Sequence, residues 1–238
     1  MVYVILFVIA ALWYYSHKRK KAKAAAIAQA KAESEYRLAK KHEFSMMNIE
    51  FQNLLKTVMS DAVILDTETT GLTNKSEIVE ISIIDTQGNV LLDTLVKPKT
   101  RMRDDSKAAS IHGITNAMLK DAPTWADIHD QVCEILKGRT VITYNAEFDC
   151  RLMAQTAEKH GLELPDFQAE CAMLIYGYWE GTASSRGDGF KWHKLQNACN
   201  HLNVQIEGTA HRALSDCKST LGVLQNMIGQ SIQPRKGF

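Results

Sequence analysis

The sequence lacks the cysteine patterns of zinc-binding and disulfide-rich proteins. Its 238 residues include five cysteines, no two of them closer than 17 positions, so there is no Cys-x-x-Cys motif for a metal or for redox chemistry. An odd number of widely spaced thiols is typical of reduced cysteines inside a cell. We therefore expect neither a structural zinc site nor a disulfide framework.

The sequence also has little net charge, +1 at pH 7, and that charge is unevenly distributed. Residues 1–56 contain ten basic and four acidic side chains, whereas the remainder contains 18 basic and 23 acidic side chains. A net negative remainder argues against a protein that grips long stretches of duplex through many phosphate contacts. It is compatible with an enzyme that takes one strand end into an acidic pocket, where metal ions neutralise the phosphate.

One long apolar run is present, and it lies at the N-terminus. Residues 2–15 (VYVILFVIAALWYY) are uncharged and are followed by a cluster of basic side chains. We expect these residues to be a membrane anchor, with aromatic residues at the interface and lysines that reach the headgroups. The basic cluster on its C-terminal side predicts a single-pass protein whose catalytic domain is cytoplasmic. A signal peptide, a buried core helix and an in-plane amphipathic helix are the alternatives.

Residues 18–58 are expected to form a long helix. Residues 22–32 are rich in Ala, Lys and Gln and contain no Pro or Gly, which favours a helix. Apolar side chains then recur at steps of three and four residues, from Phe44 through Phe51 to Val58, and make one stripe. Two interpretations remain open. The helix is a spacer whose last turns pack on the following domain, or it is a coiled-coil helix that forms a homodimer.

The remaining chain alternates between strand and helix patterns. Apolar runs at 62–65, 78–84 and 90–96 predict strands, the last two joined by a hairpin at Gln87-Gly88-Asn89. Helical periodicity follows at 124–137, a strand at 140–144, and further helices at 146–160, 194–202 and 211–228. Three successive strands followed by alternating strands and helices predict an α/β domain with a mixed sheet flanked by helices.

The first of these strands ends in two carboxylates. Asp66 and Glu68 are two residues apart, so both side chains leave the same face of the strand. Two carboxylates that close repel each other unless a cation lies between them. Because Mg²⁺ takes oxygen ligands, often one or two carboxylates and a substrate phosphate, the pair is a candidate metal site. An acidic strand end that arises by chance is the simpler alternative.

Two further acidic motifs follow. Asn145 and Asp149 lie where a strand gives way to a helix, and each is also explained by helix capping or by the helix dipole. His211 precedes Asp216 by five residues, a rotation of about 500° on an ideal helix. The two side chains therefore do not share a helix face, and we expect His211 at or before the start of the helix that carries Asp216.

Together these motifs resemble a known family. DTETTG (66–71), NAEFD (145–149) and HRALSD (211–216), with IHGIT (111–115) between them, are similar in order and separation to the DEDDh superfamily of 3′–5′ exonucleases. The proofreading epsilon subunits of bacterial DNA polymerase III belong to that superfamily. The resemblance covers roughly residues 60–230. It implies a ribonuclease H-like fold, preceded here by the long N-terminal helix.

The resemblance also implies a mechanism and a set of site residues. Two Mg²⁺ or Mn²⁺ ions would be held by Asp66, Glu68, Asp149 and Asp216, and His211 would be the general base. The partner would be the single-stranded 3′ end of a nucleic acid, with DNA favoured. The product would be nucleoside 5′-monophosphates. An exoribonuclease and an inactive module that only binds a strand or a partner are the alternatives.

Residues that hold the substrate are also implied by the resemblance, although ordinary packing explains each of them as well. They are Thr67, Leu72, His112, Asn145 and Phe148. One position departs from the family, because many relatives carry Glu five residues before the histidine of motif 111–115 and this chain has Lys107. Preference for DNA or RNA therefore does not follow from the resemblance.

A loop at 180–194 contains Gly, Ser, basic residues and Trp192. It could follow a single strand by stacking and charge, or be an exposed connection held by its tryptophan. The expected organisation is an anchor at 1–17, a helical linker at 18–58, the exonuclease domain at 59–230 and a tail at 231–238.

Overall fold

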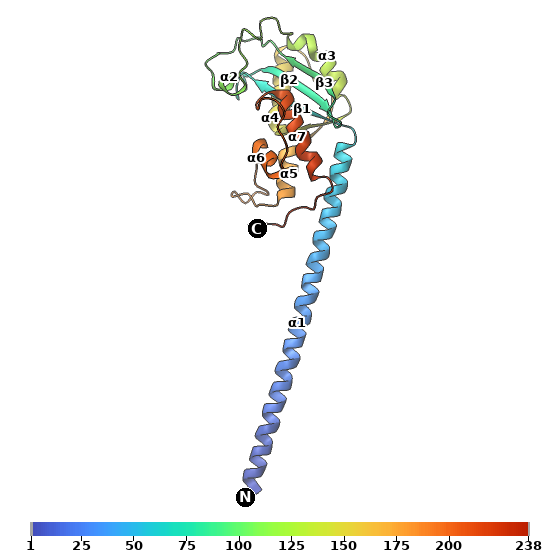
Figure 1. The fold of residues 1–238 in the computed structure, drawn as a ribbon, viewed down its shortest axis with the longest axis vertical. Helices are drawn as coiled ribbons and strands as arrows, with labels where there is room; N and C mark the ends of the chain where they lie inside the picture. Colours follow the sequence, from blue (N-terminus) through green and yellow to red (C-terminus); the bar gives the residue numbers. More distant parts are fainter. Residues whose placement is uncertain (1, 238) are drawn as a thin grey trace. The chain divides into compact units, whose positions relative to one another are not determined.

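The computed structural model describes residues 2–237, and for residues 2–17, 19, 20, 22 and 24–28 it describes the backbone alone. The chain divides into two compact units, Met1–Glu50 and Phe51–Phe238. The first unit consists of most of the helix α1 (Val2–Met59) (Figure 1). The long N-terminal helix predicted from the sequence is therefore confirmed.

The membrane anchor predicted at residues 2–15 is not supported. Within the part of the chain that the structure describes, none of the helices combines the length and the apolar composition that crossing a bilayer requires. Fourteen helical residues rise about 21 Å, whereas the hydrocarbon core is about 30 Å thick. The predicted single-pass location is wrong, and the cytoplasmic placement that depended on it has no remaining support. The side chains of residues 2–17 lie outside the described residues.

The larger unit contains one mixed five-stranded sheet among the described residues, in the order β3-β2-β1-β4-β5. The strands are β1 (Ala62–Thr69), β2 (Ile78–Asp85), β3 (Val90–Leu95), β4 (Thr140–Thr143) and β5 (Gln168–Cys171). The pairs β1–β2 and β2–β3 are antiparallel, whereas β1–β4 and β4–β5 are parallel. β1 is therefore the central strand, with its polar end between the antiparallel and parallel halves.

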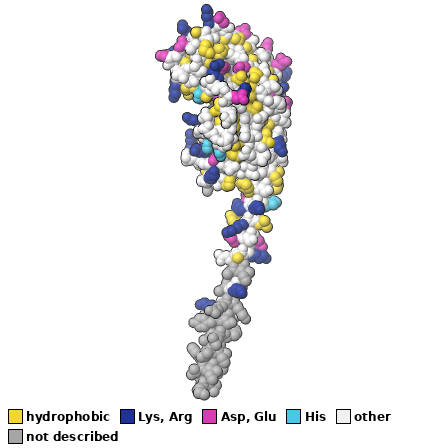
Figure 2. All heavy atoms as spheres, in the orientation of Figure 1, with side chains coloured by type: hydrophobic (Ala, Val, Ile, Leu, Met, Phe, Trp, Pro, Cys, Tyr) yellow, Lys and Arg dark blue, Asp and Glu magenta, His cyan; other side chains and the backbone are white. Residues whose placement is uncertain are grey.

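The helices of this unit are α2 (Lys107–His112), α3 (Trp125–Leu136), α4 (Ala146–Lys159), α5 (Ala172–Glu180), α6 (Leu195–Leu202) and α7 (Ala213–Met227). Four of them, α3, α4, α6 and α7, agree with the predicted ranges, whereas α2 and α5 were not predicted. On the face of the unit that Figure 2 displays, lysine and arginine side chains are spread out and do not form one broad patch. This dispersal agrees with the near balance of charge in the sequence.

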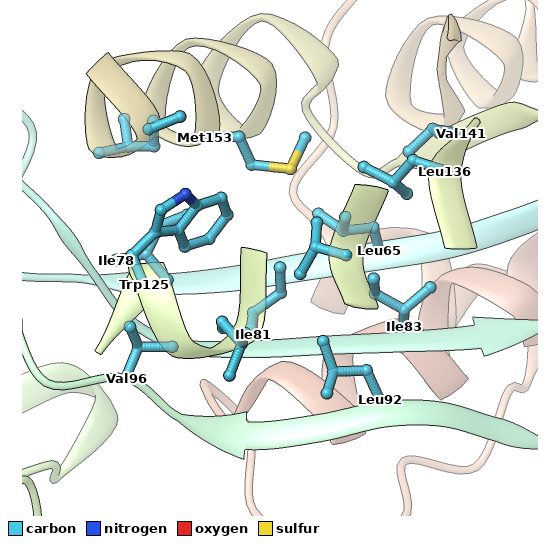
Figure 3. Packing of buried hydrophobic residues seen from close by; sticks show 14 of the residues in the cluster. Leu65, Ile78, Ile81, Ile83, Leu92, Val96, Trp125, Leu136, Val141 and Met153 are labelled. Atoms are coloured by element: carbon cyan, nitrogen blue, oxygen red, sulfur yellow. The ribbon is translucent and has the colours of Figure 1, made fainter. Parts of the chain in front are cut away.

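The two faces of the sheet are covered by different helices. On one face, Trp125 from α3 and Met153 from α4 pack against strand residues such as Leu65 (Figure 3). On the other face, α7 packs on β1 and β2, and the thiol of Cys217 lies 3.6 Å from the carbonyl oxygen of Ile64. Because side chains alternate along a strand, odd-numbered residues of β1 face α3 and α4, and even-numbered residues face α7.

The last turns of α1 belong to the larger unit. Phe51, Leu55 and Val58 are buried there, and the Phe51 ring stacks on Tyr178 with centroids 5.7 Å apart. The Gln52 amide donates to the carbonyl oxygens at the C-terminal end of α7, at 3.0 and 2.7 Å. These contacts agree with the spacer interpretation of the helix. Nothing in the described residues supports the coiled-coil homodimer.

Candidate active site

The first part of the site is the end of β1. Asp66 and Glu68 follow Ile64 at steps of two, so they leave the face of the sheet that α7 covers. Their side chains are half-buried beneath the first turn of that helix. Thr67 points to the opposite face and is 6% exposed. The strand therefore divides its polar side chains between α7 and α4.

The second part is the N-terminus of α4. Asp149 lies in the first turn of this helix and is 4% exposed. The hydroxyl of Thr67 donates to its Oδ1 at 2.7 Å, which joins the two elements. Asn145 occupies the N-cap position, but its side chain makes no capping hydrogen bond. Simple capping, the alternative explanation for this residue, is thus not what its side chain does.

The third part is the entry into α7. His211 lies before the helix with a φ of 60°, a left-handed conformation that non-glycine residues seldom adopt. Arg212 is the N-cap, and Asp216 lies in the first turn. One ligand atom each from Glu68, His211 and Asp216 lie within 4.8 Å of one another. The chain thus brings a histidine and two carboxylates, from opposite ends of the domain, to one point.

A buried ion pair supports this third part. Glu80 of β2 pairs in register with Glu68 and is 4% exposed. It accepts hydrogen bonds from the Nε of Arg212 and, at 3.0 Å, from the backbone N–H of Ala213. The first residues of α7 are therefore tied to the strand beside Glu68. Sequence reasoning missed both partners, although an acid inside the apolar run 78–84 was a signal that a partner must exist.

The pKa values of the four carboxyl groups are raised, because burial disfavours their ionised forms, which lack a compensating positive charge. Burial, followed by the charges of Asp149 and Asp216, raises the pKa of Asp66. Burial, followed by the charge of Asp216, raises the pKa of Glu68 to about 8. Burial also raises the pKa of Asp149 and of Asp216. Hard divalent cations take carboxylate oxygens as ligands, and a bound cation would stabilise the ionised form of these four carboxyl groups. The residues present therefore fit a divalent metal.

The residues predicted to hold the substrate occupy several environments. Leu72 is 76% exposed, and Phe148 is half-buried with the Arg151 guanidinium 5.4 Å from its ring. His112 is buried, and both of its ring nitrogens have partners. The Ile114 N–H donates to its Nδ1, and its Nε2 lies 3.2 Å from the carbonyl oxygen of Thr69. Their role in binding stays a prediction, as does that of Thr67 and Asn145.

A cavity of about 680 Å³ opens beside the histidine and the carboxylates. Asn145, His211 and Asp216 contribute to its lining, so three of the residues singled out in the sequence meet there. Tyr144, which was not predicted as a site residue, also lines it, as does Trp192 from the loop whose role the sequence left open. The Tyr144 hydroxyl donates to the carbonyl oxygen of His193 at 2.8 Å, which fixes the wall formed by the loop before α6.

Comparison with known proteins identifies the family. The profile of RNase_T, described as Exonuclease, matches residues 63–224. The chain belongs to this exonuclease family. The enzyme class predicted from the sequence, an exonuclease and hence a hydrolase, is confirmed. Members of this family depend on divalent metal ions, which agrees with the cluster of carboxylates.

Two relatives illustrate what this exonuclease is similar to. The uncharacterized exonuclease CP81 of Escherichia phage 186 is 44% identical over 179 residues, which cover 73% of this chain and 91% of that protein. The DNA polymerase III subunit epsilon of Rickettsia felis is 37% identical over 177 residues, covering 70% of this chain and 73% of that subunit. The helix α1 lies outside residues 63–224, the range that the family profile matches.

A solved structure shares the fold. Exonuclease X in complex with 5′ overhanging duplex DNA superimposes with a TM-score of 0.51 and 26% identity, covering 70% of this chain and 90% of that one. The ribonuclease H-like fold predicted from the motifs, a mixed sheet flanked by helices, is thereby confirmed.

Proposed function

We propose that this exonuclease removes nucleoside 5′-monophosphates one at a time from the 3′ end of a nucleic-acid strand. The observation that carries the proposal is the convergence of Glu68, His211 and Asp216 within 4.8 Å, beside the half-buried Asp66, whose pKa is raised by burial and by its acidic neighbours. A phosphodiester brought to this point would meet carboxylates that can hold metal ions and, within the same cluster, an imidazole. The reaction is hydrolysis of the last phosphodiester bond.

Asp66, Glu68, Asp149 and Asp216 would hold the metal, and two Mg²⁺ or Mn²⁺ ions suit four carboxylates better than one. When bound, such a pair stabilises the charge on the attacking and leaving oxygens of an in-line displacement. The chain contributes the positioning. Thr67 holds the Asp149 carboxylate by a hydrogen bond, so this ligand is oriented before any metal arrives.

His211 is the general base in this proposal. It is exposed and lies at the mouth of the cavity, where it can take the proton of the attacking water as the new phosphorus–oxygen bond forms. An imidazole exchanges protons near neutral pH, which suits that step. The bond from phosphorus to the 3′ oxygen of the preceding nucleotide then breaks, and that oxygen takes a proton from solvent.

We favour single-stranded DNA as the substrate. Two of the relatives named above are linked to DNA by their descriptions, namely a DNA polymerase III subunit and an exonuclease solved with 5′ overhanging duplex DNA. The dispersed basic side chains do not favour a protein that grips a long duplex (Figure 2). The rival in the same class is an exoribonuclease, since exposed Lys107 stands where many relatives carry Glu. The presence of all five reactive side chains argues against an inactive binding module.

The test uses oligonucleotides labelled at the 5′ end, in single- and double-stranded forms of DNA and RNA, with Mg²⁺, with Mn²⁺ and with EDTA. We expect a ladder of products that shorten by one nucleotide, faster for single-stranded DNA than for RNA, and no products in EDTA. Faster degradation of RNA would favour the exoribonuclease. No mononucleotide release with either metal would favour the inactive module.

A further inference from the structure

A short hairpin comes directly before Trp192, the first residue of the segment before α6 that lines the cavity. Ala183 and Phe190 form an antiparallel bridge, and the backbone N–H of Ser184 donates to the carbonyl oxygen of Gly189 at 2.8 Å. The backbone N–H of Lys191 donates to Thr182 at 2.9 Å. The segment that the sequence left as either a strand-binding loop or a plain connection therefore has a defined shape.

The hairpin is held against the domain by contacts with α5 and with Arg235 near the C-terminus. At Gly177 of α5, an added Cβ would lie 2.9 Å from the carbonyl oxygen of Lys191, so the helix and the hairpin approach as closely as glycine permits. The Arg235 guanidinium lies 4.2 Å from the Tyr178 ring centroid and 4.5 Å from that of Phe190. A surface held in this way can present a side chain in one place.

Trp192 is the side chain that it presents. The ring is 57% exposed, whereas Trp125 and Trp179 are 0% and 2% exposed. Because an exposed indole leaves a large apolar surface in water, it is expected where a partner covers it. The Arg186 guanidinium lies 5.7 Å from the ring centroid, which places a positive charge beside this surface.

The ring also stands between two hollows. It lines the cavity of about 680 Å³ that contains His211 and Asp216. It lines a second cavity, of about 170 Å³, with two basic side chains and one acidic side chain, namely Arg186, Lys191 and Asp188. A strand that leaves the reactive groups along this wall would thus pass the indole and then meet two cationic side chains. Alternation of aromatic and cationic groups is how proteins hold single strands without reading their sequence.

We propose that Trp192 is a stacking platform for an unpaired base upstream of the 3′-terminal nucleotide, and that Arg186 and Lys191 hold the adjoining phosphates. This assignment rests on the proposed function, because it takes the 3′ end to lie at His211. An indole face can receive a base only when that base is not already paired and stacked in a duplex. The enzyme therefore prefers ends with several unpaired nucleotides to blunt ends.

The test measures KM and kcat for single-stranded oligonucleotides of two to ten nucleotides, with the full chain and three variants. Trp192→Leu keeps the apolar bulk without an aromatic face, Trp192→Phe keeps a face, and Arg186→Gln removes the charge. We expect Trp192→Leu to raise KM about tenfold for the longer substrates, with little change in kcat. Trp192→Phe restores most of the loss. An equal KM for wild type and Trp192→Leu at every length overturns the proposal.

An abasic site in the oligonucleotide locates the contact. When the base that stacks on the ring is absent, wild type and Trp192→Leu should have the same KM. We expect this equality for only one position of the abasic site. If the KM values of wild type and Trp192→Leu differ wherever the abasic site is placed, the proposal is overturned. Because the Trp192 side chain is exposed, we expect its replacement to leave the fold intact. Melting temperatures equal to that of the wild type would show this.

Binding of a fluorescent oligonucleotide in Ca²⁺ separates this inference from the proposed function. A tenfold weaker complex with Trp192→Leu supports the platform even if no cleavage is seen. Equal affinities, together with cleavage by the wild type, retain the nuclease and reject the platform.

Discussion

The Nε of Arg212 lies 3.1 Å from each of the two carboxylate oxygens of Glu80. This contact joins the residue that follows His211 to the strand that pairs with Glu68. Since Glu80 also accepts the backbone N–H of Ala213, one buried carboxylate organises the entry into α7. The left-handed backbone at His211 is thereby held from the side that faces the sheet.

We expect removal of this contact to lower both stability and turnover. Glu80→Gln cannot neutralise the guanidinium, and breaking a partly buried ion pair costs on the order of 3 kcal/mol. We expect kcat to fall about tenfold or more as His211 loses its fixed position, while KM changes less. Chemical denaturation and steady-state kinetics measure the two effects. The control is Lys218→Gln, a substitution in α7 that removes the exposed ion pair between Lys218 and Glu207. It should change the free energy of unfolding by no more than about 0.5 kcal/mol. A normal kcat in a stably folded Glu80→Gln variant would contradict the positioning role.

Asp66→Asn is expected to abolish activity and yet stabilise the metal-free protein. The pKa of Asp66 is raised by burial and by its acidic neighbours, so a neutral side chain there removes repulsion. The melting temperature in EDTA should rise by about 2–4 °C, whereas the increase that Mg²⁺ or Mn²⁺ gives to the wild type should disappear. Thermal unfolding with and without metal measures both. The matched control is Asp130→Asn, an exposed aspartate of α3. A destabilised Asp66→Asn in EDTA would show that the carboxylate serves the fold.

His211→Gln separates a general base from a metal ligand. Loss of a general base should lower kcat by about 10²–10⁴-fold, with the metal concentration for half-maximal activity unchanged. The proximity of His211 to Glu68 and Asp216 makes the second measurement necessary, because the imidazole could itself bind metal. A large rise in the metal requirement would assign it as a ligand. His42→Gln, on the exposed surface of α1, is the control.

Stability without metal should depend on pH in a particular direction. Burial and the charge of Asp216 raise the pKa of Glu68 to about 8, whereas an unfolded glutamate titrates near 4.3. Between these values the folded protein binds a proton that the unfolded chain has lost, so raising the pH favours unfolding. In EDTA the free energy of unfolding should fall from about pH 5 to about pH 8. Divalent metal should remove most of this slope.

Two comparisons check the pH dependence. Glu68→Gln should reduce the slope of the profile in EDTA, because its side chain does not titrate. The raised pKa values of Asp66, Asp149 and Asp216 keep part of the slope. Stability that rises across the same window in EDTA would contradict the raised pKa.

The sequence predicted most of the larger unit, because its central strands are apolar runs and its long helices are periodic. It did not predict the short helix α2 (Lys107–His112), the strand β5 (Gln168–Cys171) or the helix α5 (Ala172–Glu180). The edge strand β5 is polar and half exposed, and it exists through its parallel pairing with β4. α5 contains Gly177, which lowers helix propensity and serves the close approach of the hairpin.

The reactive residues were predicted from their motifs and their resemblance to a family, whereas their supports were not. Glu80 and Arg212 are 132 positions apart, so neither residue indicates the other in a linear sequence. The same holds for Trp192, whose exposure and place in the cavity wall depend on the packing of the hairpin on α5. The anchor at residues 2–15 was inferred from hydropathy and basic flanks, and its length is insufficient for the span it required.

The order of the elements along the chain has a consequence for the cell that makes this enzyme. β1 and β2 are synthesised early, but their carboxylates acquire the histidine and the last acid only when α7 joins the sheet. Fragments that end before this helix, whether from interrupted translation or from proteolysis, lack Asp216 and the fixed position of His211. Under the proposed function, nuclease activity therefore arises only after the final helix has been made.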